Sequence, residues 1–201
     1  MKKASVALVV LLLIGLAAIA FWYADFHAST SESRTESQVS TYRSSKSGVK
    51  AEELLAEREV ALYVAGADEL ADALRVEMLG FLQASESFGK VTCLDLAPEQ
   101  TDQPVLVIKV QSEQGLWTPF FAQSGLAVRV AFASDGDVSW WHQSGPVILS
   151  GDESIVRVEG KLQVVDDTRG VTSRLAYQKH LGRQIAKEVS KALQNALSSP
   201  T

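Results

Sequence analysis

The chain has 201 residues, of which 46% are hydrophobic and 21% are charged, and its formal net charge is −5. This composition excludes a disordered, collagen-like or coiled-coil protein, and the length suits one globular domain with an additional segment. The single cysteine, Cys93, excludes an intramolecular disulfide framework and a zinc site built on several thiolates. The net negative charge argues against nucleic-acid binding, because such proteins need a basic surface for the phosphates.

The N-terminal segment contains a long apolar run. Residues 4–24 read ASVALVVLLLIGLAAIAFWYA and carry no charged side chain, which matches the roughly 20 apolar residues that a helix needs to cross a bilayer. Two lysines precede the run and three aromatic residues end it, as expected for a cytoplasmic N-terminus and a headgroup-level aromatic belt. The pattern predicts a single-pass transmembrane signal-anchor helix over residues 1–24, with the C-terminal domain in the periplasm or at the cell exterior.

A cleaved signal peptide is the alternative interpretation of this segment. Its positive start and the small residues Ala18 and Ala20 fit an A-x-A cleavage pattern. The apolar run is, however, longer than the usual 7–15-residue core of a signal peptide. We therefore expect a retained anchor.

Residues 25–49 are predicted to form a flexible linker. Serine and threonine dominate residues 28–48, and Val39 and Tyr42 are the only large apolar residues there. Such a segment buries too little apolar area to offset the entropy lost on ordering. A glycosylated stalk or a phosphorylated segment is the alternative interpretation.

Residues 50–198 are predicted to form one α+β domain. A short helix over residues 50–58 precedes a strand over 59–65. A helix over 68–84 follows, with Asp68 as its expected N-cap and an apolar face at Leu70, Leu74, Met78 and Phe81.

Strands follow over residues 91–96, 104–111, 126–133, 138–141 and 155–165, and one more is possible over 147–149. Apolar residues alternate along residues 126–133. A helix over 172–197 ends the domain, and its apolar stripe consists of Leu175, Leu181, Ile185, Val189, Leu193 and Leu197. The order β-α-β-β-β-β-α predicts a two-layer domain with two helices on one face of a mostly antiparallel, four- to six-stranded sheet.

The chain carries no recognised catalytic or metal-binding motif. Cys93 has no sequence neighbour that would activate it, so a small buried side chain is the expected role. The acidic pair Asp135 and Asp137 is too small for a calcium site and suits a tight turn. The sequence therefore predicts no enzyme activity, cofactor or metal.

Aromatic residues in a connection between two predicted strands, and just past a predicted hairpin turn, form the first candidate contact surface. They are Trp117, Phe120, Phe121, Trp140 and Trp141. Bulky rings in a connection indicate a contact surface, a ligand cleft or membrane contact, or else a loop that folds back to complete the core.

Basic residues on the last helix form the second candidate surface. Residues 51–171 contain 8 Lys and Arg against 20 Asp and Glu, whereas residues 172–201 contain 5 against 1. Four of these cations recur every four residues and share one helix side: Lys179, Arg183, Lys187 and Lys191. They form either a docking face for an acidic partner or anionic lipid, or a solvated face suited to a helix C-terminus.

These features together predict a membrane-tethered, non-catalytic accessory or adaptor domain outside the cytoplasm. Its partners would be the membrane, through residues 4–24, and a protein of the cell envelope or cell surface. A small-ligand or lipid-binding domain that uses the aromatic segment as its pocket is the alternative. A hydrolase or transferase would require Cys93 or Ser87 close to His142 or His180.

Overall fold

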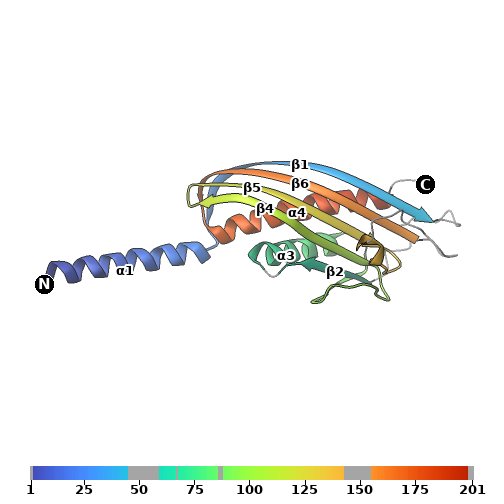
Figure 1. Ribbon diagram of the computed structural model, residues 1–201, viewed down its shortest axis with the longest axis horizontal. Helices are drawn as coiled ribbons and strands as arrows, with labels where there is room; N and C mark the ends of the chain where they lie inside the picture. Colours follow the sequence, from blue (N-terminus) through green and yellow to red (C-terminus); the bar gives the residue numbers. More distant parts are fainter. Residues whose placement is uncertain (1, 45–58, 67, 86–87, 143–154, 199–201) are drawn as a thin grey trace.

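The computed structural model describes residues 2–44, 59–66, 68–85, 88–142 and 155–198. Two helices cover one face of a six-stranded sheet, and a third helix projects from one end (Figure 1). Within these ranges, the α-helices are α1 (Lys2–Tyr23), α3 (Glu69–Ala84) and α4 (Arg174–Ser198). The strands are β1 (His27–Ser44), β2 (Glu59–Ala65), β3 (Lys90–Cys93), β4 (Val105–Thr118), β5 (Phe121–Ala133) and β6 (Ile155–Thr172). The predicted α+β class is confirmed.

The sheet is mixed, with the strand order β1-β6-β5-β4-β2-β3. The β1, β6, β5 and β4 strands pair antiparallel, whereas β2 pairs parallel with both β3 and β4. The prediction of a mostly antiparallel sheet is therefore corrected. The physical reason is the β2-α3-β3 unit, because a helix that crosses over between two neighbouring strands leaves them parallel.

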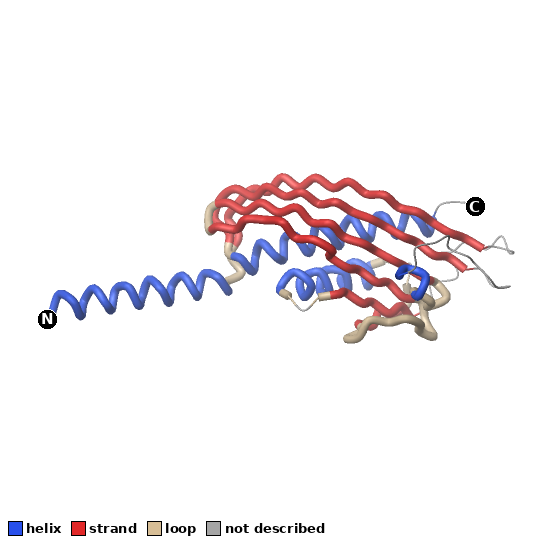
Figure 2. The backbone as a smooth tube through the Cα atoms, in the orientation of Figure 1, coloured by secondary structure: helices blue, strands red, loops and turns tan. Residues whose placement is uncertain are grey.

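The predicted linker is wrong for residues His27–Ser44, which form the edge strand β1 (Figure 2). β1 pairs with β6 along its whole length, from His27 opposite Thr172 to Ser44 opposite Ile155. Backbone hydrogen bonds to β6 replace the apolar burial that this segment lacks. Side-chain bonds add to them, as between Ser31 Oγ and Thr168 Oγ1 at 2.7 Å.

The prediction of a transmembrane anchor is also corrected. In the part of the chain that the structure describes, no helix combines the length and the apolar character needed to cross a membrane. The last turn of α1 packs on the domain instead, because the Trp22 ring lies 4.9 Å from the Trp117 ring and the Arg174 guanidinium lies 4.9 Å from the Trp22 ring. The predicted single-pass topology and extracytoplasmic location therefore lose their structural basis.

The main core lies between the sheet and the helices α3 and α4. The apolar stripe predicted for the last helix is confirmed for Leu181, Ile185, Val189, Leu193 and Leu197, which are all buried, whereas Leu175 is only partly buried. The predicted N-cap of α3 is also confirmed, since Asp68 Oδ1 accepts a hydrogen bond from Ala71 N at 2.8 Å. A second, smaller cluster of buried residues lies on the opposite face of the sheet and includes Trp140 and Trp141.

Three local predictions differ from the structure. β4 and β5 are longer than predicted and meet in one hairpin, so the segment expected as a connection is mostly strand. Residues Ser139–His142 form a 3₁₀ helix rather than a strand. Cys93, expected to be buried, is exposed on the edge strand β3. The predicted helix over 50–58 and the possible strand over 147–149 lie outside the described residues.

Candidate functional site

The tip of the β4–β5 hairpin presents an exposed phenylalanine. Thr118 Oγ1 accepts a hydrogen bond from Phe121 N at 3.0 Å and donates one to Phe121 O at 2.8 Å, which closes the turn. Backbone bonds from Gly170 N to Phe120 O and from Thr172 N to Pro119 O hold the turn against the end of β6. Phe120 is held outward by this arrangement and is 71% exposed.

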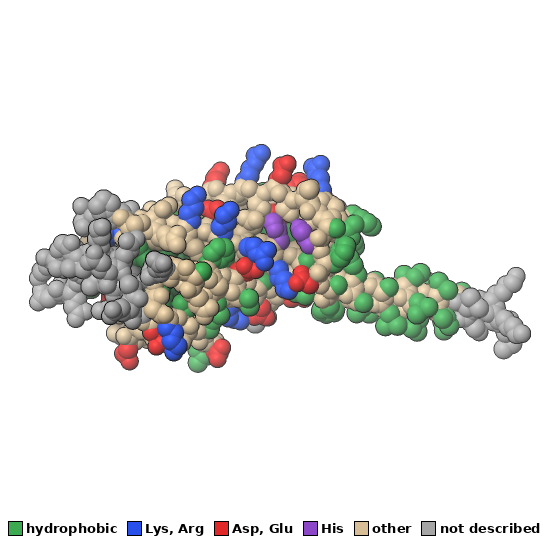
Figure 3. Space-filling model, turned by 180° about the vertical axis from the view of Figure 1, so that it is seen from behind, with side chains coloured by type: hydrophobic (Ala, Val, Ile, Leu, Met, Phe, Trp, Pro, Cys, Tyr) green, Lys and Arg blue, Asp and Glu red, His purple; other side chains and the backbone are tan. Residues whose placement is uncertain are grey.

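This tip is continuous with the apolar surface of α1. Trp117 packs against the main core and against Trp22, and thereby joins the hairpin to the end of α1. Figure 3 shows apolar side chains along the projecting helix and on the adjoining end of the domain. We call this surface the apolar end; its large exposed members are Leu8, Val9, Val10, Leu11, Leu12, Leu13, Ile14, Leu16, Ile19, Tyr23, Phe26 and Phe120.

The two other predicted aromatic residues lie at the far end of the sheet. Trp140 and Trp141 are 8% and 6% exposed and pack on the outer face of the sheet, beside the C-terminal end of β5. Trp117 pairs with the start of β5, opposite Ala122, so about 35 Å of strand separates the two groups at the usual rise per residue. The five aromatic residues therefore form no single surface or pocket.

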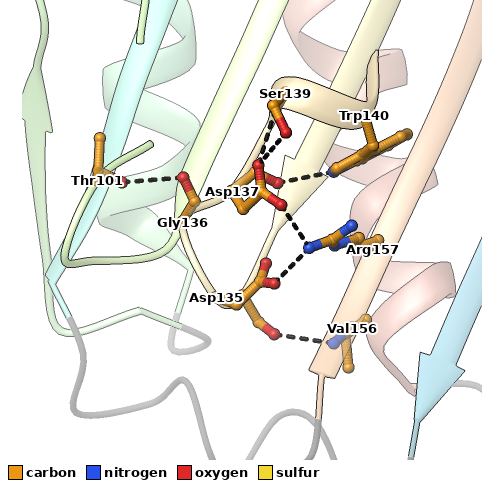
Figure 4. Close-up of polar contacts among 9 residues, drawn as sticks. Thr101, Asp135, Gly136, Asp137, Ser139, Trp140, Val156 and Arg157 are labelled. Atoms are coloured by element: carbon orange, nitrogen blue, oxygen red, sulfur yellow. Dashed lines mark hydrogen bonds and ion pairs between the residues drawn. The ribbon is translucent and has the colours of Figure 1, made fainter. Parts of the chain in front are cut away.

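A buried arginine organises this outer-face cluster (Figure 4). Arg157 Nη2 donates to Asp135 Oδ2 at 2.6 Å and to Asp137 Oδ2 at 2.9 Å. The Trp140 indole donates to Asp137 O at 2.7 Å, and the Arg157 guanidinium lies 5.8 Å from that ring. Gly136 makes the turn possible, because its φ is 75° and a Cβ there would collide with the carbonyl oxygen of Thr101. These contacts support the interpretation of the acidic pair as turn residues.

Replacement of Asp137 by alanine is expected to lower the free energy of unfolding by about 1 kcal/mol, the usual cost of losing such a cap. Its carboxylate accepts hydrogen bonds from Ser139 N at 2.9 Å and Ser139 Oγ at 2.6 Å. Partial burial raises the pKa of Asp137, but these bonds and the Arg157 charge outweigh burial and hold the pKa below its ordinary value. Urea denaturation at pH 7 measures the loss, and an unchanged midpoint would contradict it.

The predicted basic row is only partly free for a partner. Lys179 Nζ lies 2.6 Å from Asp25 Oδ2, and the Arg183 guanidinium donates to both carboxylate oxygens of Glu77, at 3.2 and 2.9 Å. The hydrogen bonds and charge of Glu77 raise the pKa of Arg183. Of the four cations, Lys187 and Lys191 are exposed and form no ion pair with another described residue. The predicted docking face is thereby reduced to these two lysines.

Sequence reasoning missed a buried polar cluster between β1, β6 and α4. Asp166 is fully buried, and its Oδ1 contacts His180 Nε2 at 2.9 Å and Ser33 Oγ at 2.5 Å. Thr168 Oγ1 donates to Asp166 Oδ2 at 2.8 Å. The His27 ring stacks on the His180 ring, with 5.8 Å between centroids. The alternation of inward-facing residues along β6 continues past residue 165, and this pattern could have identified the polar cluster from the sequence.

The order of groups in this cluster differs from that of a catalytic triad. In a triad the histidine separates the serine from the carboxylate, whereas here Ser33 bonds directly to Asp166 and lies 3.5 Å from His180 Nε2, the same nitrogen that contacts the carboxylate.

Cys93 lies on β3, four strand spacings from the strand of Asp166, or about 19 Å. Ser87 and the side chain of His142 lie outside the described part of the chain.

A cavity of about 510 Å³ adjoins the polar cluster, between α3 and α4. Histidine and charged side chains gather near the root of the projecting helix in Figure 3. The four carboxylates of the cavity wall already have cationic partners: Asp25 pairs with Lys179, Glu77 with Arg183, Glu69 with Arg174, and Asp72 with Arg75. The described residues provide no group of three or more His, Cys, Asp or Glu side chains that could hold a metal ion. The cavity therefore offers no uncompensated charge that would select a ligand.

Comparison with known proteins leaves the family open. No protein-family model matches the chain, and no curated protein matches it. Solved structures of the PelC dodecamer from Paraburkholderia phytofirmans are similar at low level. One is 12% identical with a TM-score of 0.36 and covers 81% of this chain and 99% of its own. A second, of a form with one leucine replaced by methionine, is 11% identical with a TM-score of 0.34, over 76% and 98%.

Proposed function

We propose that the chain is a non-catalytic adaptor domain that binds a partner protein through its apolar end. The observation that carries this proposal is the exposure of α1 together with the hairpin tip. Leu12 and Ile19 are each 59% exposed and Phe120 is 71% exposed. Contiguous apolar surface of this kind on a protein marks an interaction site, because covering it releases the free energy of apolar burial.

The geometry suits an apolar partner surface with Phe120 as an anchor. Interface energy concentrates in a few large side chains near the centre of the contact. Phe120 projects from a turn that hydrogen bonds hold on both sides, so little conformational entropy remains to be lost when it binds. The alternative, a small-ligand pocket built from the aromatic segment, lacks this support because Trp117 and Trp140 lie at different ends of the sheet.

Partner capture tests the proposal. A photo-crosslinking residue replaces Phe120 in cells, and a second variant carries it at Lys109, an exposed position on β4. We expect a reproducible protein adduct from position 120 and none from position 109. Equal labelling at both positions, or labelling at neither, would contradict the proposed surface.

Phe120→Ser is expected to weaken partner binding about tenfold or more, the effect of removing a hot-spot side chain. Its melting temperature should change little because Phe120 is mostly exposed. Val165→Ser is the matched control, since Val165 is an apolar residue on β6 that is 51% exposed. Quantitative pull-down with the captured partner should separate the two variants. Equal loss in both would show that apolar exposure in general, rather than this surface, governs binding.

A further inference from the structure

The free edge of β1 carries charged residues but lacks the other features that normally protect an edge strand. β1 is the outermost strand and pairs, among the described residues, with β6 alone. It is 18 residues long and contains no proline, glycine or lysine. Its register with β6 runs without a bulge. Natural sheets usually shorten, bend or charge such an edge to prevent pairing with another chain.

We infer that this edge pairs with a second copy of the same chain. The two β1 strands run antiparallel about a two-fold axis at Thr35 and join two six-stranded sheets into one. This surface is separate from the apolar end, so the inference goes beyond the proposed function. Figure 1 shows α1 projecting past the end of the sheet rather than along the free edge of β1, which leaves the edge accessible.

Charge complementarity selects a second copy as the occupant. Glu32, Arg34 and Glu36 lie on the same face of β1, are exposed, and form no ion pair with another described residue. Antiparallel pairing about Thr35 places Arg34 of each copy directly opposite Glu36 of the other. Opposite charges that face each other across strands stabilise the pair, whereas like charges destabilise it. A parallel pairing in the same register would place each of these residues opposite its own kind.

The length of β1 selects the position of the axis. An axis at Thr35 lets residues 27–43 of each strand pair over almost the whole of β1. An axis at Ser33 would instead pair Arg34 with Glu32 and would use only residues 27–39. More backbone hydrogen bonds form about Thr35, and each backbone group that finds a partner contributes to the free energy of association.

Cysteine crosslinking of the full chain tests the axis. In a Cys93→Ser background, which removes the exposed native thiol, Thr35→Cys places two sulfurs on the axis. Directly opposed Cα atoms are about 4.5–5.5 Å apart, within the range of a disulfide. Val39→Cys is the control on the same face of β1, because its two copies would lie about 26 Å apart.

We expect a disulfide-linked dimer from Thr35→Cys at about ten times the yield from Val39→Cys, since only the former satisfies disulfide geometry. Association through the apolar end would crosslink neither position selectively. Equal yields, or no dimer from Thr35→Cys, would overturn the inference.

Charge exchange provides a second, independent measurement. Arg34→Glu and Glu36→Arg should each raise the dissociation constant of the dimer about tenfold, because two attractive pairs become repulsive. The double variant R34E/E36R should restore it, and an equimolar mixture of the two single variants should form a heterodimer. Sedimentation velocity measures the association of the two single variants, the double variant and the mixture. Failure of the double variant to recover, or an equal effect of Glu32→Arg, would overturn the pairing about Thr35.

Discussion

Replacement of Asp166 by alanine should lower the free energy of unfolding by about 3 kcal/mol, the upper end of the cost of leaving a buried polar group without its hydrogen-bond partner. Asp166 is fully buried and receives contacts from Ser33, Thr168 and His180 on three different elements. Removing the carboxylate leaves these groups without their shared acceptor in the interior, and an unsatisfied buried polar group is costly. Urea denaturation monitored by circular dichroism gives the value.

Asp167→Ala is the matched control for Asp166→Ala. Asp167 is the next residue along β6, and among the described residues its carboxylate forms an ion pair with the exposed Arg169 alone, at 3.2 Å. Surface ion pairs of this type contribute little to stability. We therefore expect a change below about 0.5 kcal/mol. Losses of similar size in both variants would show that the strand, rather than the buried cluster, responds to the substitution.

The contribution of Asp166 should also depend on pH. Burial raises its pKa, but the hydrogen bonds from His180, Ser33 and Thr168 and the charge of His180 outweigh burial and hold the pKa below its ordinary value of 3.8. The unfolded chain then takes up the proton at higher pH than the folded chain, so the contribution is complete above about pH 4 and is lost as the pH falls through the folded pKa. The stability difference from Asp166→Ala should shrink below pH 4, and a constant difference would contradict the role of the charge.

Replacement of Gly182 by alanine should lower the free energy of unfolding by about 2 kcal/mol, a typical cost of overpacking. Gly182 lies on α4 where it crosses α3. An added Cβ would lie 2.9 Å from Leu74 N and 3.1 Å from Ala73 Cβ. Since backbone atoms of α3 cannot move aside as a flexible side chain can, the two helices must separate and the core between them must open.

Gly80→Ala is the same substitution at another helix position, and it is expected to raise the free energy of unfolding rather than lower it. Gly80 lies inside α3, and an added Cβ would meet no other atom within 4 Å. Alanine in a helix interior is more favourable than glycine by about 1 kcal/mol. Thermal unfolding of the two variants should therefore move the melting temperature in opposite directions. Stabilisation by both substitutions would mean that α3 and α4 are not in close contact at Gly182.

Predictions from periodic apolar patterns in the sequence agreed with the structure. The alternation in residues 126–133 and the four-residue spacing from Leu181 to Leu197 predicted elements that the structure contains. β1 carries no such pattern, because its serines and threonines bond to β6 side chains and lie at the edge of the sheet. Its order depends on a partner strand more than a hundred residues away. Local composition therefore indicated a linker where the chain forms a strand.

The candidate contact residues also show the difference between what the local sequence predicts and what depends on distant segments of the chain. The sequence placed Phe120 among five aromatic candidate contact residues, and the structure leaves its ring 71% exposed. The sequence grouped Phe120 with Trp140 and Trp141, which the structure places at the far end of the sheet and inside a closed cluster. Proximity in sequence and aromatic character carry no information about which end of a strand a connection reaches.

The amino-acid sequence alone determined the α+β class, the apolar faces of α3 and α4 and the turn at Asp135 and Gly136, because each depends on residues a few positions apart. Only the tertiary structure decided the parallel placement of β2, the strand β1 and the buried cluster around Asp166. These depend on pairings between segments distant in the chain, whose free energy comes from backbone hydrogen bonds and desolvated polar contacts that have no local signature.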